Sequence, residues 1–348
     1  MKSATEQDSE SDFYTAAAHL INCPGIETEQ TLIEFLQYRE SSCQSIKITK
    51  RKIVEVLARL GCIDAVPAIG KCLWSDDVYL VENSVWALQI LQCQDQIFID
   101  QMIDILRVDT TNQRISIQCL ATLNISRSVD VIRPFQESSV PGIKGAAISA
   151  IAKLTRNFTR VPEISLNLLL PNQMDRHFAI QDLIDVDAID QLNEIFAAPV
   201  SPVFKMRAVR EMYGENSVSV VDLNLLSSLD SLFSCDLSAI NCVHEYDESP
   251  SSEFLVRDLY NTDFSRCYLA LKYLSSRSAS EIFPMLKESW VEEAHNDYGA
   301  HYCFICLFGS IFDWSAESKR WIFEVLLSSI SNLRPQFQKS RAASILSL

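Results

Sequence analysis

Two closely spaced thiols are the first residues of this chain whose type and spacing suggest chemistry. Cys303 and Cys306 are separated by two residues, the spacing of a redox pair or of half a zinc site. The pair lies in an apolar run of helical periodicity, without a second pair nearby. Cysteine is among the most buried residue types, so such a pair is typical of a core. We therefore expect no metal site, and we expect most of the 11 cysteines to pack as small core residues.

The densest mixture of aromatic, acidic and amide side chains lies between residues 74 and 86. Its members are Trp74, Asp76, Asp77, Tyr79, Glu82, Asn83 and Trp86. The last four are spaced three and four residues apart, so they share one helix face if the helix begins at or before Tyr79. Structural roles are also open, because Asp76 and Asp77 suit a helix N-cap and Trp86 lies near the expected buried face.

A repeat contains this stretch and is the strongest pattern in the sequence. An apolar position recurs every 31 or 32 residues, through Leu57, Leu88, Leu120, Ile151 and Leu183. Each of these anchors lies in a helical pattern and is followed by a polar break and a second amphipathic segment; examples are residues 65–73, 96–106 and 129–135. Two helices per unit, stacked so that neighbours bury their apolar faces, form a helical solenoid. The sequence therefore predicts an all-α superhelix of HEAT-like repeats.

The repeat register slips after residue 190. Pro199 and Pro202 mark a break, and the next matches centre on Val209, Leu271 and Ile305, with a degenerate unit between the first two. The chain is thus expected to divide into three segments: a disordered polar tail at 1–12, an N-terminal lobe at 13–198 and a degenerate C-terminal lobe at 199–348.

A second position recurs six or seven residues before each anchor. It is basic in four units and acidic in one; the residues are Arg51, Glu82, Arg114, Lys144 and Arg176. HEAT units often carry a basic residue at this place. We expect these side chains to form a structural ladder with neighbouring carbonyls and carboxylates.

Composition excludes several classes of function. The 45 acidic residues against 30 basic ones give a net charge of −15, which is unsuited to nucleic acid because phosphate contacts require clustered Lys and Arg. The 8 glycines form no phosphate-binding loop. No apolar run of membrane length and no signal peptide is visible, so we expect no membrane insertion and a reducing, cytoplasmic setting.

With these features the chain resembles the E/F-type phycobilin lyases, HEAT-repeat proteins that attach linear tetrapyrroles to cysteines of phycobiliproteins. The resemblance rests on the ~31-residue units, the acidic character and the segments 77–88 and 268–274, and it spans most of residues 40–310. The Asn-His-Cys-containing motif of the isomerising members is absent, and the run Asn241-Cys242-Val243-His244 does not reproduce it. The resemblance thus favours attachment without isomerisation, by a lyase that serves phycoerythrin.

The resemblance implies modest chemistry, because the nucleophile is a thiol of the client protein. A linear tetrapyrrole, or bilin, is large, flexible and partly apolar, and carries two propionates. A carboxylate near its pyrrole nitrogens favours the protonated form, whose ethylidene carbon is more electrophilic. The lyase contributes orientation and charge placement.

On this basis the residues of the 74–86 stretch receive roles. Asp76, Asp77 and Glu82 are the candidate catalytic carboxylates at the pyrrole nitrogens. Trp74, Tyr79, Asn83 and Trp86 are candidates to contact the bilin, with the rings packing on it, and Arg114 is the candidate partner of a propionate, since guanidinium suits carboxylates.

The resemblance also implies ligands and partners. It implies no tightly bound cofactor, phycoerythrobilin or a related bilin as substrate, and a phycobiliprotein subunit, of phycoerythrin, as client; the need for a partner lyase stays open. Two other functions remain: a non-catalytic factor that binds bilin or phycobiliprotein, as in phycobilisome degradation, and a scaffold whose groove holds a partner helix or peptide. The HEAT-repeat di-iron hydroxylases are rejected, because they need repeated His-Glu pairs and this chain has only His244-Glu245.

Overall fold

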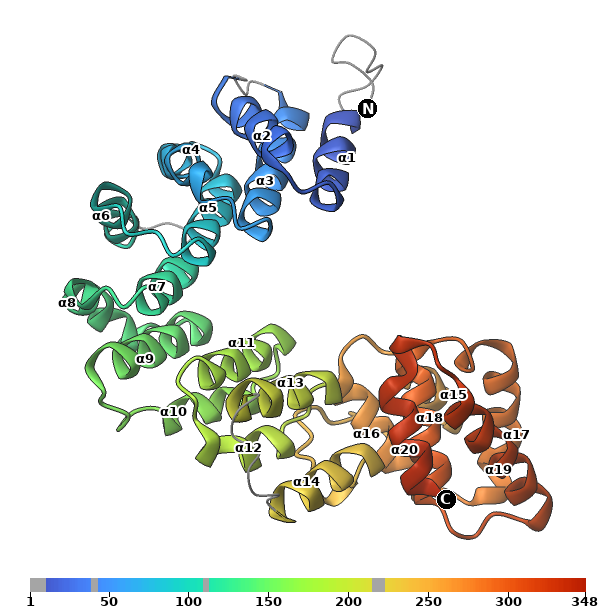
Figure 1. Ribbon diagram of the computed structural model, residues 1–348. Coiled ribbons are helices and arrows are strands. Elements are labelled where there is room, and N and C mark those ends of the chain that lie inside the picture. Colours follow the sequence, from blue (N-terminus) through green and yellow to red (C-terminus); the bar gives the residue numbers. More distant parts are fainter. Residues whose placement is uncertain (1–10, 39–42, 109–112, 215–222) are drawn as a thin grey trace. The chain divides into compact units, whose positions relative to one another are not determined.

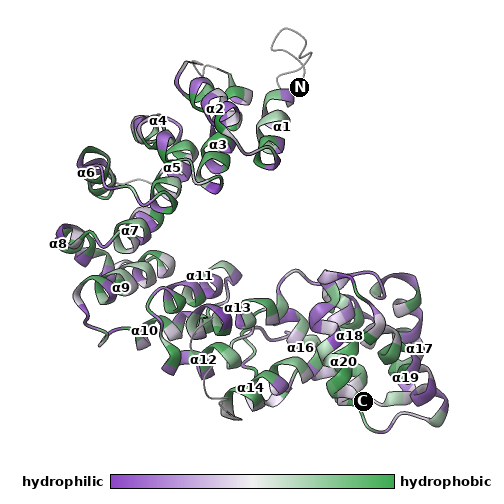
Figure 2. Ribbon diagram, viewed as in Figure 1, coloured by the Kyte–Doolittle hydropathy of each residue, from purple (hydrophilic) through white to green (hydrophobic). Residues whose placement is uncertain are grey.

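A computed structural model of the chain describes residues 11–38, 43–108, 113–214 and 223–348. In these ranges every regular element is a helix, and none is a β-strand (Figure 1). The predicted all-α class is confirmed. Figure 2 shows hydrophobic and hydrophilic residues on the helices of both halves of the chain, as expected for elements that bury one side.

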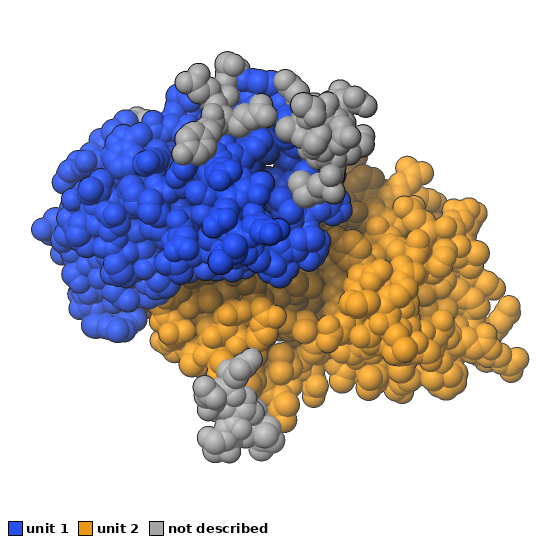
Figure 3. Space-filling model, turned by 45° about the horizontal axis from the view of Figure 1, so that its top comes forward, with its two compact units in different colours: residues 1–160 blue, residues 161–348 orange. Residues whose placement is uncertain are grey.

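The described chain forms two compact units, residues 1–160 and 161–348, coloured separately in Figure 3. This division differs from the predicted register boundary at 198/199, which stays a prediction. Of the predicted tail, residues 1–10 lie outside the described residues, whereas Ser11 and Asp12 belong to the first helix.

Two layers of helices make up the first unit. Its helices are α1 (Ser11–His19), α2 (Ile26–Tyr38), α3 (Gln44–Arg59), α4 (Val66–Lys71), α5 (Val78–Ile90), α6 (Gln96–Ile105), α7 (Gln113–Thr122), α8 (Val129–Ile132) and α9 (Pro141–Thr155). Helices α3, α5, α7 and α9 pack successively in one row, and α2, α4, α6 and α8 pack against that row. One hydrophobic core runs through the stack from Ala17 to Ile151.

The predicted anchors form the centre of this packing. Leu57, Leu88, Leu120, Ile151 and Leu183 are all buried near the C-terminal ends of α3, α5, α7, α9 and α11 (Gln173–Ile184). The second segment predicted at 96–106 is α6, and those at 65–73 and 129–135 are short α-helices flanked by 3-10 turns. The repeat is therefore confirmed up to residue 184.

Each of these repeats closes with a left-handed residue shortly after its anchor. The residues with positive φ are Gly61, Gln92, Asn124, Arg156 and Asp187. In four of the five, the residue that follows donates its backbone N–H to the anchor carbonyl, as Cys93 does to Leu88 at 2.9 Å. This is the hydrogen bond of a Schellman motif, which satisfies a carbonyl left unpaired at the helix end.

The second unit continues with less regular repeats. Its helices are α10 (Pro162–Ser165), α11 (Gln173–Ile184), α12 (Leu192–Ala197), α13 (Pro202–Tyr213), α14 (Leu223–Ser234), α15 (Ser252–Asp258), α16 (Phe264–Leu274), α17 (Ala279–Ser289), α18 (Tyr298–Ser310), α19 (Ala316–Ser331) and α20 (Gln338–Ser347). The predicted break at Pro199 and Pro202 lies between α12 and α13. Leu271 and Ile305 are buried, but at α13 the buried position is Ala208, while Val209 is half-buried. Within the described ranges, no helix has both the length and the apolarity that a bilayer span requires.

Candidate functional site

The predicted stripe lies on α5. This helix begins at Val78, and the Asp77 carboxylate accepts a hydrogen bond from the backbone N–H of Tyr79 at 3.2 Å. The helix therefore includes Tyr79, and Tyr79, Glu82 and Trp86 fall on one side of it. Of the two acids that suited the N-cap, the structure uses Asp77.

Arg51 of α3 binds both carboxylate oxygens of Asp77. Its Nε and Nη2 atoms donate to Oδ2 and Oδ1, each at 2.8 Å, and the Asp77 side chain is only 4% exposed. The same guanidinium lies 4.7 Å from the centre of the Tyr79 ring. Asn83 donates to the backbone carbonyl of Arg51 at 3.2 Å. Asp77 and Asn83 thus fasten α5 to α3 and place the ring of Tyr79.

Other members of the stretch face solvent. Trp74 is 54% exposed and Tyr79 is 62% exposed, and Trp74 also contacts Phe98 edge-on. Asp76 makes one long ion pair, 3.7 Å to Lys47, and is otherwise in solvent. The Glu82 side chain is exposed as well. Two rings and two carboxylates are therefore accessible to a ligand or a client, while the half-buried Trp86 packs against the core.

Arg114 belongs to the basic ladder. It lies on α7 and donates to the carbonyl of Gly142, in the first turn of α9. Arg51 makes the equivalent contact with Asp77, and the fully buried Arg176 donates to the carbonyl of Leu170 at 2.8 Å and pairs with Asp263. The predicted structural ladder is confirmed at these three positions. Whether Arg114 also meets a propionate stays a prediction.

The paired thiols are core residues. Cys303 and Cys306 are both buried in α18, and burial raises the pKa of Cys306 well above its ordinary value. A thiol held protonated in this way is a poor nucleophile. The burial of both side chains agrees with the expectation that these cysteines pack as small core residues.

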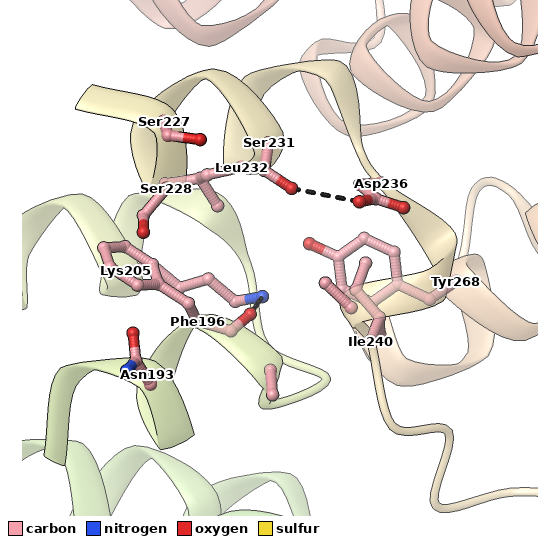
Figure 4. Close-up of a pocket in the computed structure, with 12 residues that line it drawn as sticks. Asn193, Phe196, Lys205, Ser227, Ser228, Ser231, Leu232, Asp236, Ile240 and Tyr268 are labelled. Carbon is pink, nitrogen blue, oxygen red and sulfur yellow. Dashed lines mark hydrogen bonds between the residues drawn. The ribbon is translucent and has the colours of Figure 1, made fainter. Parts of the chain in front are cut away.

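A cavity of about 280 Å³ in the second unit was missed by the sequence analysis (Figure 4). Its walls come from α12, α13, α14 and α16, and the fully buried Lys205 lines it. Lys205 Nζ donates to the carbonyl of Phe196 at 2.6 Å and lies 5.5 Å from the Tyr268 ring. Burial lowers the pKa of Lys205 to about 8.

Lys205 has a structural role. Its ammonium group binds the carbonyl of Phe196 at the end of α12, where helix carbonyls lack partners within the helix. In the sequence it precedes the buried Ala208 by three residues, which places it on the buried side of α13. This three-residue spacing from Ala208 is the sequence signal that could have identified Lys205 as a buried residue.

Comparison with known proteins gives the family. No family model matches the chain. The chain is 99% identical over 348 residues to the bilin biosynthesis protein CpeY of Synechococcus sp. (strain WH8020), covering 100% of this chain and 83% of that protein. It is 32% identical over 339 residues to the uncharacterized phycocyanin operon protein Y of Pseudanabaena tenuis (strain PCC 7409), covering 96% and 79% of the two chains.

The fold comparison agrees. The complex of CpcE and CpcF of phycocyanin lyase from Nostoc sp. PCC7120 matches with a TM-score of 0.56 and 22% identity, over 65% of this chain and 91% of that chain. At this level of identity the match establishes a shared helical-repeat fold. Together with the two sequence relatives, it shows that the chain belongs to the E/F-type, HEAT-repeat phycobilin lyase family.

Proposed function

We propose that this protein is a phycobilin lyase, which binds a linear tetrapyrrole and assists its thioether attachment to a cysteine of a phycobiliprotein subunit. The observation that carries this proposal is the 99% identity, along the whole chain, to a bilin biosynthesis protein. The helical-repeat fold shared with a phycocyanin lyase complex supports it. A solenoid offers an extended surface for a large ligand and a protein client.

The reaction requires no redox partner and no leaving group. The client thiolate attacks the ethylidene carbon of the bilin, the carbon–sulfur bond forms, and the proton released by the thiol ends on the bilin. The lyase then acts by holding the bilin and by stabilising its protonated form. We assign this electrostatic role to Glu82 and Asp76, and ring contact to Tyr79 and Trp74. Asp77, held by Arg51, positions Tyr79.

The finer assignments are a phycoerythrobilin-type substrate, a phycoerythrin subunit as client, a cytoplasmic location and a partner lyase. The phycocyanin lyase whose fold is similar is a complex of two proteins, CpcE and CpcF, which supports a partner for this chain as well.

Co-expression tests the proposal. The chain is produced with a bilin-synthesising pathway and single phycobiliprotein subunits, with and without candidate partner lyases. We expect a covalent adduct, fluorescent in zinc, on one subunit. Bilin absorbance on the purified chain without any adduct supports the non-catalytic binding factor instead. If neither bilin absorbance nor an adduct is found, the result supports the scaffold function instead.

A further inference from the structure

A second pocket in the second unit combines apolar walls with positive charge. It has a volume of about 560 Å³, within the range of sites that enclose small-molecule ligands. Its walls come from α13, the start of α18, the segment that enters α20 and the first residues of α20. Val203, Met206, Tyr298 and Pro335 supply the apolar surface.

Every charged residue that lines this pocket is a cation: Arg207, Arg210 and Lys339. Such a site contrasts with the chain as a whole, whose net charge is −15. Arg207 and Arg210 lie one turn apart on α13, so their side chains leave the same face about 5–6 Å apart at Cβ. Their present partners are exchangeable: Arg207 donates to the amide oxygen of Gln181, and Arg210 to the exposed carboxylate of the adjacent Glu211.

Lys339 is the unusual member of the set. It is 5% exposed, and its ammonium group lies 4.4 Å from the ring centre of Phe264, 5.0 Å from that of Tyr302 and 5.8 Å from that of Tyr298. It makes no ion pair with any other residue that the structure describes. Burial lowers its pKa. A buried ammonium held by ring faces at the wall of a pocket is a site at which an anion would compensate the lost hydration.

We propose that this pocket is a bilin-binding site of its own, separate from the α5 surface, with Arg207 and Arg210 pairing with the two propionates of a bilin and Lys339 adding positive charge at the pocket wall. The inference rests on the proposed function, which supplies the ligand. The two propionates project from the neighbouring central rings of a bilin, a spacing that two arginines one turn apart match. The apolar wall accommodates the tetrapyrrole body, and guanidinium binds carboxylate in a planar, paired geometry.

The experiment compares two ligands on two charge variants. The ligands are phycoerythrobilin and its dimethyl ester, which keeps the rings and removes both negative charges. The test variant is Arg207→Gln/Arg210→Gln. The matched control is Lys319→Gln/Arg320→Gln, which removes two exposed charges from α19, outside the pocket. Affinity is measured by absorbance titration at low and moderate salt, and folding by the melting temperature.

The wild-type chain and the control variant are expected to bind the free acid at least about tenfold more tightly than the ester, with an affinity that falls as salt rises. The Arg207→Gln/Arg210→Gln variant is expected to lose that preference and to bind the ester as the wild type does, with an unchanged melting temperature. An unchanged preference in the variant overturns the proposal, and so does equal weakening for both ligands. If the wild-type chain binds neither ligand, the proposed function itself fails, and this site with it.

Discussion

Asp77 and Glu82 are carboxylates five residues apart, and their different surroundings give them different roles. Asp77 is buried, caps α5 and has both oxygens bound by Arg51. Glu82 lies one turn further along the helix surface, in solvent. A carboxylate already paired with a guanidinium has little left to offer a ligand, whereas an exposed one changes its environment when a ligand covers it. Glu82 is therefore the sharper test of the α5 surface.

Glu82→Gln keeps the shape of the side chain and removes its charge. If Glu82 faces the pyrrole nitrogens, the absorption of the bound bilin should shift and transfer to the client should slow roughly tenfold, the scale of one charge-assisted hydrogen bond. The melting temperature should stay nearly constant because the side chain is exposed. Asp77→Asn is the control, and it should lower the melting temperature by breaking the pair with Arg51. An unaltered spectrum and rate in Glu82→Gln would remove Glu82 from the site.

His301 gives the second prediction at this scale. It is 2% exposed and lies between the rings of Trp290 and Phe337, each 4.7 Å away between centres. Burial, helped by the nearby positive side chains, lowers its pKa to about 4. Between pH 6.5 and 4 the unfolded chain therefore binds a proton at His301 that the folded chain does not bind. The free energy of unfolding is highest above this window and falls as the pH is lowered through it.

Replacing His301 by Phe should flatten this dependence. The free energy of unfolding, measured in urea at several pH values, should fall between pH 6.5 and 4 by up to about 3 kcal/mol more in the wild type than in His301→Phe. His19→Gln, at an exposed position, should keep the wild-type slope. Equal slopes for the wild type and His301→Phe would show that His301 is protonated without unfolding.

At the scale of the elements, each repeat helix ends in a left-handed turn that the sequence did not predict. The anchors were found from their spacing because all are aliphatic. The left-handed residue that follows each anchor varies, from Gly61 and Asn124 to Gln92 and Arg156. Gly and Asn adopt this conformation readily, whereas Gln and Arg do not. The residue type at this position therefore does not predict the turn. At Gln92 the backbone hydrogen bond from Cys93 to the carbonyl of the anchor Leu88 holds the turn in this conformation.

Gln92 is where this strain is most easily relieved. It is exposed and has φ of 51° at the end of α5. Gln92→Gly should stabilise the chain by about 0.5–1 kcal/mol, because the relief of left-handed strain exceeds the added entropy of the unfolded chain. Gln89→Gly, inside α5, should destabilise it by about 1 kcal/mol. The free energies of unfolding in urea decide; a loss of stability in Gln92→Gly would contradict the strain.

The candidate site could be predicted only where the residues are close in the sequence. The stripe on α5 follows from helical spacing, and the N-cap role of Asp77 was one of two alternatives. Arg51 was expected to contact a neighbouring carbonyl or carboxylate, but Asp77 was not identified as its partner, because the pair joins α3 to α5. The pocket lined by Arg207 and Lys339 joins α13 to α20, and no local pattern brings such distant segments together.

Across the molecule, most of the buried charged side chains lie in the second unit, which buries Asp182 and Asp258 as well as the cations Arg176, Lys205 and Lys339. Each of these three cations is held by carbonyls, ring faces or a carboxylate. The packing is modular, because separate hydrophobic cores lie within the two units, one from Ala17 to Ile151 and one from Cys235 to Ala343.

This modular packing predicts where damage travels. Leu120 is fully buried in α7, the helix that packs between α5 and α9. Leu120→Ala should cost about 2–5 kcal/mol, by lost burial and the cavity that remains. In a stack whose repeats contact only their neighbours, amide hydrogen exchange should accelerate first in α7, then in α5 and α9, and least in the second unit. Leu226→Ala, at an exposed position of α14, should leave the exchange of the first unit unchanged. If exchange accelerates equally in all helices after Leu120→Ala, the chain unfolds as one cooperative unit. If exchange is unchanged in residues 80–125, Leu120 is not an anchor of the repeat.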